Sequence, residues 1–322
     1  MSEKTRSLEG RVAVVTGAGL SIGRAHALRL AEEGARVVVN DLGGRLDGTG
    51  ADGTLAEAVV KEIKAQGGEA TANGDSVSTM AGARRIVETA LDHFGRVDIL
   101  INNAGIHRAA LIQDATEEDF DLIMAVHVKG TFAVTRHVAP HFIAQRSGVI
   151  VNTGSDSGLG QYGNSIYATA KEAIAGFTRS IARDLGPHNI RANLIRPGAR
   201  SRMVMDPKAA GFAVDAEQKY GFPASGDIWV TRMVTPEIFA SLDTEYVADA
   251  AVWLCTDAAR HINGQTFRIM GPEISLMTDP QSIRSVYHKE RWDMAGFNST
   301  FAKASLHGHL VNRFMPEVNT GS

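Results

Sequence analysis

The chain has 322 residues, of which 44% are hydrophobic, enough for one large domain or two ordinary ones with a buried core. Its formal net charge of -3 argues against nucleic acid or an anionic membrane as the main partner, and no stretch approaches the roughly 18 apolar residues of a membrane span. The single cysteine, Cys255, excludes an intrachain disulfide, and the polar opening over residues 1–9 carries no signal core. We therefore expect a cytoplasmic protein.

Short apolar runs alternate along the chain with helical patterns, which predicts βα units around a parallel sheet. The fold class we expect is α/β, a single Rossmann-type doubly wound parallel sheet with helices on both faces. The predicted strands cover residues 12–16, 36–40, 69–74, 97–101, 148–153, 190–195 and 265–269. The predicted helices cover residues 22–33, 54–66, 79–94, 117–144, 165–185 and 244–256. Because proline lacks an N–H group, we expect the fourth helix to bend or break near Pro140.

Two regions depart from this alternation. Residues 197–236 have no clear period and hold methionine and aromatic residues among polar ones: Met203, Met205, Phe212, Phe222 and Trp229. A loop of this length is usually functional, and methionines suit adaptable apolar surfaces, so we expect a substrate lid, with core packing as the alternative. The tail from 272 to 322 carries scattered aromatic residues. We expect one dinucleotide-binding domain over 1–271, including the substrate loop at 197–236, and a C-terminal extension over 272–322.

A glycine-rich turn joins the first predicted strand to the first helix, with the sequence Thr-Gly-Ala-Gly-Leu-Ser-Ile-Gly over residues 16–23. Gly17 permits the tight turn and Gly23 lets the helix approach the sheet, so the helix N-terminus faces a pyrophosphate. Ser21 replaces the usual middle glycine. Its hydroxyl can donate to a phosphate, but its side chain leaves the phosphate less room to approach the backbone of the turn. We expect Gly17, Ser21, Ile22 and Gly23 to bind a dinucleotide; the alternative is a glycine-rich loop with no ligand.

Asp41 ends the second predicted strand, 24 residues after Gly17. An acid at this position accepts hydrogen bonds from the ribose hydroxyls of NAD and repels the extra phosphate of NADP. The next three residues, Leu42, Gly43 and Gly44, include no base. We therefore expect NAD as the cofactor; the alternative is that Asp41 only opens a turn before the glycines.

Tyr167 and Lys171 stand four residues apart in the predicted helix 165–185, so their side chains project from one face. A free tyrosine has a pKa of about 10, and bringing it to about 7 needs roughly 4 kcal/mol of preference for the phenolate. A neighbouring ammonium in a partly dry pocket is a reasonable source of that preference. Together with the glycine turn, this pair indicates a nicotinamide-dependent oxidoreductase with a tyrosine acid/base.

Four motifs in order over roughly residues 8–270 resemble the short-chain dehydrogenase/reductase family. They are the glycine turn, Asn102-Asn103-Ala104-Gly105, the Ser155/Tyr167/Lys171 set and Arg196-Pro197-Gly198. Val39 to Gly44, Asp75-Ser76-Val77 and Ser201-Arg202-Met203 resemble the (3R)-hydroxyacyl-CoA dehydrogenase module of peroxisomal multifunctional enzyme type 2 and its bacterial relatives.

The resemblance implies a role for each motif residue. Tyr167 would be the acid/base, Lys171 would lower its pKa and hold the nicotinamide ribose, and Ser155 would orient the substrate oxygen. Ser155 lies 12 residues before Tyr167, one fewer than is usual in the family, so Ser157 is the fallback. His127 takes the place of the family's helix asparagine. Because histidine titrates near neutrality it would relay protons; the alternative is a hydrogen-bonded helix histidine.

The same resemblance implies further cofactor contacts. Asn103 would pack by the cofactor, and Asp75 and Ser76 would meet the adenine. The nicotinamide amide would be bordered by Pro197, Gly198, Ala199 and Arg200.

The function implied is an NAD-dependent oxidoreductase that interconverts a secondary alcohol and a ketone on a bulky apolar small molecule, a 3-hydroxyacyl-CoA or a steroid. Two alternatives stay open: an NAD-linked dehydrogenase of an aromatic or terpenoid alcohol, and a non-catalytic NAD sensor or scaffold. The reaction requires no metal, and His137 and His141, although four residues apart, lack a third ligand. Arg202 and Lys208 either meet CoA phosphates or face water. By resemblance we expect a homo-oligomer, a dimer or tetramer, formed through helices 117–144 and 165–185.

Overall fold

A computed structural model describes residues 6–201 and 242–282, with isolated positions between 203 and 218 and between 285 and 297. Over these residues one sheet has the strand order β3-β2-β1-β4-β5-β6-β7-β8. All neighbours pair in parallel except β8, which is antiparallel to β7. The strands are β1 (Val12–Thr16), β2 (Arg36–Asn40), β3 (Ala70–Asn73), β4 (Ile99–Asn102), β5 (Gly148–Thr153), β6 (Ile190–Gly198), β7 (Thr266–Met270) and β8 (Glu273–Met277).

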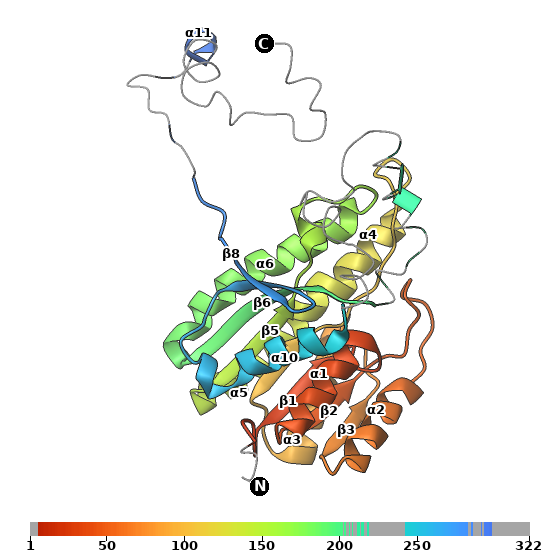
Figure 1. Ribbon diagram of the computed structural model, residues 1–322, viewed down its shortest axis with the longest axis vertical. Coiled ribbons are helices and arrows are strands. Elements are labelled where there is room, and N and C mark those ends of the chain that lie inside the picture. Colours follow the sequence, from red (N-terminus) through yellow and green to blue (C-terminus); the bar gives the residue numbers. More distant parts are fainter. Residues whose placement is uncertain are drawn as a thin grey trace.

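Helices cover both faces of this sheet (Figure 1). They are α1 (Ser21–Glu32), α2 (Thr54–Ala65), α3 (Met80–Phe94), α4 (Glu117–Met124), α5 (Gly130–Gln145), α6 (Ser165–Leu185), α10 (Thr244–Cys255) and the single turn α11 (Met294–Gly296). A π-helical turn, Ala125–Lys129, joins α4 to α5. Short 3-10 turns cover Asp156–Leu159, Gly186–His188 and Asp257–Ala259. No helix among the residues just described is long and apolar enough to cross a membrane.

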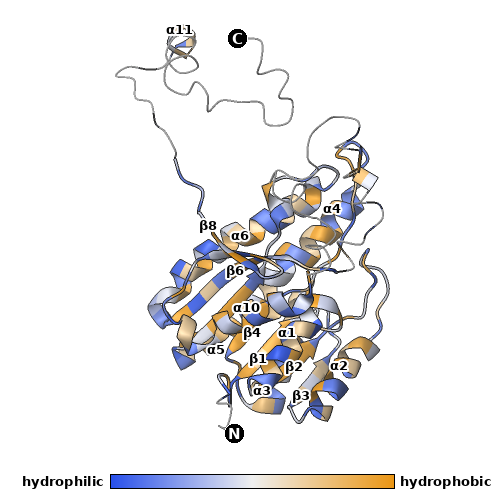
Figure 2. Cartoon of the chain, viewed as in Figure 1, coloured by the Kyte–Doolittle hydropathy of each residue, from blue (hydrophilic) through white to orange (hydrophobic). Residues whose placement is uncertain are grey.

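Both faces of β1 are buried, which explains why its sequence is a continuous apolar run instead of an alternating one. Val15 belongs to the core cluster that includes residues of α1, α2 and α10. Val14 belongs to the opposite cluster, with residues of α3, α5 and α6. The hydropathy colouring in Figure 2 shows the apolar residues gathered in the strands and hydrophilic ones on the helices around them. The predicted fold class, a doubly wound parallel sheet with helices on both faces, is confirmed.

The break expected near Pro140 is wrong, because α5 continues past this residue to Gln145. Pro140 is exposed, while Val138 and Phe142 on either side are fully buried, so core packing holds the helix despite the missing N–H donor. The irregular turn lies instead at residues 125–129 and contains His127. Single π-helical turns inside helices occur frequently at functional sites.

β8 is an addition that the sequence reasoning did not foresee. Gly271, with a φ of +56°, makes the turn from β7 into β8, and β8 pairs along β7 from Glu273 to Met277. The boundary expected at residue 271 thus falls inside this hairpin. The division into 1–271 and 272–322 stays a prediction.

Candidate active site

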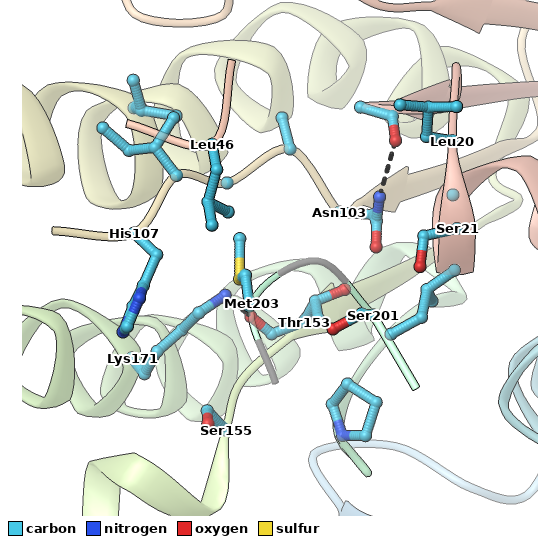
Figure 3. Close-up of a pocket in the computed structure, with 18 of the residues that line it drawn as sticks. Leu20, Ser21, Leu46, Asn103, His107, Thr153, Ser155, Lys171, Ser201 and Met203 are labelled. Carbon is cyan, nitrogen blue, oxygen red and sulfur yellow. Dashed lines mark hydrogen bonds between the residues drawn. The ribbon is translucent and has the colours of Figure 1, made fainter. Parts of the chain in front are cut away.

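A cavity of about 450 Å³ opens at the carboxyl ends of the central parallel strands (Figure 3). The chain leaves β1 for β2 and β3 on one side and returns to β4 on the other, and such a switch in strand order is where open α/β sheets bind ligands. The predicted site residues that line the cavity are Gly17, Ser21, Ile22, Gly23, Asp41, Asp75, Ser76, Asn103, Ser155, Tyr167, Lys171, Pro197, Gly198 and Ala199.

Two glycines of the first turn have no room for a side chain. A Cβ on Gly17 would lie 2.7 Å from the Cα of Ala104, and one on Gly23 would lie 2.0 Å from the carbonyl oxygen of Gly17. Asn103 fixes this turn, because its Nδ2 donates to the Gly17 carbonyl at 3.0 Å (Figure 3). Ser21 has a φ of +51°, the left-handed conformation of the glycine it replaces, and lines the cavity.

Asp41 is held at the cavity by two backbone N–H groups. Its Oδ2 accepts from Gly19 at 2.7 Å and its Oδ1 accepts from Gly43 at 2.7 Å. A Cβ on Gly19 would lie 2.8 Å from Oδ2, so this close approach requires glycine. The carboxylate therefore has a fixed position at the end of β2.

Asp75 and Ser76 follow β3 at the same edge of the sheet. The Asp75 carboxylate accepts from Arg85 Nε at 2.6 Å, and its backbone carbonyl accepts from Asn40 Nδ2 at 2.9 Å. The Ser76 hydroxyl is 2.9 Å from that of Ser78. Asp75 thus keeps its place at the cavity through neighbours on β2 and α3, and Ser76 contacts the turn that leads into α3.

The serine, tyrosine and lysine of the predicted catalytic set meet at one point. Tyr167 and Lys171 are buried on the same face of α6, and Lys171 Nζ lies 5.5 Å from the centre of the tyrosine ring. The Lys171 ammonium donates to the carbonyl oxygen of Thr153 at 2.9 Å. Ser155, two residues after β5, lines the cavity with Tyr167 and donates its hydroxyl to that of the fallback Ser157 at 3.1 Å, while the Ser157 hydroxyl donates to Gln161.

Burial dominates the titration of this pair. It raises the pKa of Tyr167 to about 12, and the hydrogen bond from Ser155 opposes the rise only in part. It also lowers the pKa of Lys171 to about 7. In the chain alone desolvation disfavours both charged forms, so Lys171 does not bring the pKa of Tyr167 toward neutrality there; its role together with a bound nicotinamide stays a prediction.

His127 lies behind the site on the π-helical turn and does not line the cavity. Burial, reinforced by Lys171, lowers its pKa well below the usual value, so the expectation that it titrates near neutrality is wrong. Its Nε2 is 2.8 Å from the Ile106 carbonyl oxygen, while Nδ1 has no partner in the described part of the chain. The Ile106 N–H also lies 3.1 Å from Nε2, so Nε2 either donates to the Ile106 carbonyl or accepts from this N–H, according to the tautomer.

Arg200 also differs from its expected role. Its guanidinium pairs with Asp243, and its backbone N–H donates to Leu242 at 2.8 Å. The side chain is exposed and does not line the cavity. The physical reason is the nearby carboxylate, which offers the guanidinium a partner away from the site.

The substrate loop is described at few positions, and one of them, Met203, reaches the site. Met203 Sδ accepts a hydrogen bond from the Tyr167 hydroxyl at 3.6 Å, and Figure 3 shows Met203 projecting toward the middle of the site. The Phe212 ring packs edge-on against Tyr162, with 6.2 Å between ring centres. Lys208, one of the two residues named for a CoA contact, is described and exposed. The remaining residues named for the lid and the CoA contact lie outside the described residues: Arg202, Met205, Phe222 and Trp229.

Sequence reasoning missed several residues that line the cavity. Arg45 and Leu46 come from the glycine-rich loop after β2, and the Leu46 carbonyl accepts from the backbone N–H of His107 at 2.8 Å. His107 follows the Asn-Asn-Ala-Gly motif by only two residues, and that proximity was the available signal. In the described parts of the chain no group of three or more His, Cys, Asp or Glu is placed to hold a metal ion.

Comparisons with known proteins agree with this geometry. A family model described as short chain dehydrogenase matches residues 11–209. Peroxisomal multifunctional enzyme type 2 of Mus musculus is 38% identical over 288 residues, a match that covers 89% of this chain but only 35% of the mouse protein. A hydroxyacyl-CoA dehydrogenase of Mycobacterium tuberculosis is 36% identical over 325 residues, covering 96% of this chain and 91% of that one.

A solved structure shares the fold. The crystal structure of a short chain dehydrogenase from Mycobacterium paratuberculosis bound to NAD has a TM-score of 0.74 and 29% sequence identity, covering 82% of this chain and 98% of that one. Strands β1 to β6, the glycine turn and the tyrosine–lysine pair lie within the matched family region. The chain belongs to the short-chain dehydrogenase/reductase family.

Proposed function

We propose that the protein is an NAD-dependent dehydrogenase that oxidises the secondary alcohol of a 3-hydroxyacyl-CoA thioester to the ketone, or reduces the ketone in the reverse direction. The observation that carries this proposal is the meeting of Ser155, Tyr167 and Lys171 at the head of a cavity on the sheet's switch point. The acyl-CoA class is supported by the relatives named multifunctional enzyme type 2 and hydroxyacyl-CoA dehydrogenase.

The residues at the cavity fit NAD. Gly17 and Gly23 leave backbone where a side chain would collide, and the N-terminus of α1 favours an anion beside them. Asp41 stands where the ribose hydroxyls of an NAD adenosine would donate to its carboxylate. Asp75 and Ser76 would meet the adenine, and Pro197 to Ala199 would border the nicotinamide. When bound, oxidised NAD accepts a hydride and adds a positive charge to the site.

Tyr167 is the group that would hold and move the proton. In the oxidative direction its phenolate would take the hydroxyl proton of the substrate, the carbinol C–H bond would break with loss of hydride, and the carbon–oxygen bond would become a carbonyl. The Ser155 hydroxyl would donate to the same oxygen and stabilise the charge that develops there. Because burial raises the pKa of Tyr167 in the chain alone, the phenolate would need the positive charge of a bound nicotinamide in addition to that of Lys171.

The substrate end of the cavity is apolar. Leu46, Ile106 and Met203 line it, and the Tyr167 hydroxyl already has an acceptor in the Met203 sulfur. A substrate oxygen that accepts from Tyr167 would take over this weak contact. This lining suits an acyl chain or a steroid, and it equally suits the aromatic or terpenoid alcohol of the alternative hypothesis.

The test is an activity screen in which the absorbance of NADH is monitored. We expect turnover with 3-hydroxyacyl-CoA thioesters to exceed that with free steroids, aromatic alcohols and terpenoid alcohols. Tyr167→Phe is expected to remove most turnover while NADH binding, followed by fluorescence, stays unchanged. Near-normal turnover of this variant would contradict the role of Tyr167. NADH binding without reduction or oxidation of any compound would favour the sensor hypothesis.

The assembly and the location of the protein stay predictions. An apolar groove runs over the helices through which we expect it to form a homo-oligomer, and it is lined in part by Met124, Val128, Phe132, Ile174 and Phe177. We infer a dimer or tetramer that covers this groove. We also retain the expectation of a cytoplasmic location, although the mouse relative is named a peroxisomal enzyme.

A further inference from the structure

His107 joins three parts of the site that are distant in sequence. It lies on the segment after β4 and is 6% exposed. Its Nδ1 is 2.8 Å from Oδ2 of Asp206 on the substrate loop, and its Nε2 is 2.8 Å from Oδ1 of Asn164, just before α6. Its ring packs edge-on against Tyr167, with 5.1 Å between ring centres and 89° between ring planes.

The hydrogen-bonding chemistry requires a proton on Nδ1. Asp206 offers a carboxylate oxygen, which only accepts, so Nδ1–H must be the donor. With the Asn164 oxygen facing Nε2, this second ring nitrogen also acts as a donor. With the amide turned over, a neutral ring donates to Asp206 and accepts from Asn164. The contact with Asp206 is the same in both cases.

The three contacts link the substrate loop to the catalytic tyrosine. Asp206 lies three residues after Met203, whose sulfur contacts the Tyr167 hydroxyl. Asn164 lies three residues before Tyr167, and the backbone next to it pairs with the His107 segment, where the Ala110 N–H donates to the Gly163 carbonyl at 2.8 Å. The His107 and Asp206 side chains are 5% and 15% exposed, so bulk water does not easily replace either partner.

We propose that His107 is a positioning residue that fastens the substrate loop, through Asp206, and the start of α6, through Asn164, around Tyr167. The loop segment that carries Met203 and Asp206 and the phenol that handles the proton are then held in register by one side chain. This inference rests on the proposed function only in giving Tyr167 the acid/base role.

Substitutions at both ends of the pair test the inference. His107→Leu keeps an apolar body against the tyrosine ring but removes both donors, and Asp206→Asn removes the charge of the acceptor. Each is expected to lower kcat/KM for a 3-hydroxyacyl-CoA by about tenfold to a hundredfold, because small displacements of a catalytic group are costly, while NADH affinity changes less than about twofold. The double variant is expected to be no worse than His107→Leu, since the two residues act as a unit. His107→Gln, which keeps an N–H donor and an acceptor, is expected to recover most of the activity.

Gln218→Ala, an exposed change on the same loop, is the matched control and should leave activity unchanged. Losses that multiply in the double variant, or full activity of both single variants, would overturn the proposal. Hydrogen exchange provides a readout without substrate: peptides containing Met203 and Asp206 should exchange faster in His107→Leu and in Asp206→Asn, but not in the control. Unchanged exchange in both variants would also overturn it. If the wild type turns over no tested compound, the proposed function fails, while the exchange result still decides the role of His107.

Discussion

Replacing Lys171 with Met separates the effect of this buried lysine on the free energy of unfolding from its effect on turnover. Lys171 is 4% exposed, and its ammonium donates to the Thr153 carbonyl at 2.9 Å. Burial lowers its pKa from 10.5 to about 7. Methionine keeps an unbranched side chain of similar volume and carries no charge, so Lys171→Met removes the titrating group and preserves most of the packing.

The magnitude follows from the linkage between protonation and folding. Because the folded pKa is the lower one, the unfolded chain binds more protons between about pH 7 and pH 10.5, and the wild type loses stability as pH falls through this window. The loss amounts to about 4 kcal/mol at pH 7 and about 1 kcal/mol at pH 10. The hydrogen bond to Thr153 that the variant lacks costs it about 1 kcal/mol at either pH and therefore cancels between them.

The assay is urea unfolding of both proteins at pH 7 and at pH 10. The free energy of unfolding of Lys171→Met relative to the wild type is expected to be about 3 kcal/mol more favourable at pH 7 than at pH 10, while turnover is lost. Lys61→Met, an exposed change on α2, is the control and should show no such difference. An equal effect of Lys171→Met at both pH values would refute the reasoning, since the buried ammonium would then titrate as it does in water.

Three further predictions concern stability, cofactor choice and assembly. Burial lowers the pKa of His26 to about 3, and neither ring nitrogen has a partner among the described residues, so the wild type should lose stability as pH falls from about 6.5 toward 3. Relative to the wild type, the free energy of unfolding of His26→Leu is expected to rise by about 2 to 3 kcal/mol between pH 7 and pH 4.5 in denaturant unfolding, and a pH-independent difference would contradict the burial argument. Asp41→Asn removes a negative charge that would repel the extra ribose phosphate of NADPH, by up to about 4 kcal/mol at a separation of about 4 Å. The affinity for NADPH relative to NADH, measured by fluorescence titration, should therefore rise at least about tenfold. An unchanged ratio would show that Asp41 does not face the ribose. Phe132→Glu, on the apolar groove beside α6, is expected to lower the mass measured by light scattering; a mass equal to that of the wild type would exclude this groove from the interface.

Local rules were enough to find much of the fold and the site from the sequence. The alternation of apolar strands and helices predicted the parallel sheet, because a strand buried on both faces reads as a continuous apolar run, as β1 does. The glycine turn needs Gly17 and Gly23 because other backbone atoms lie where their Cβ atoms would be. Tyr167 and Lys171 share a helix face because they are four residues apart. These features depend on neighbours in sequence.

Packing between distant segments decided the rest. The sequence shows that a lysine stands beside a tyrosine, but their pKa values move apart because both side chains are removed from water by elements far along the chain. The helix irregularity lies at His127 instead of Pro140, since the proline is exposed and core contacts on either side keep α5 helical past it. His107 and Asp206 are 99 residues apart and no local pattern pairs them. Their contact exists only because the folded sheet brings the end of β4 and the substrate loop to the same side of Tyr167.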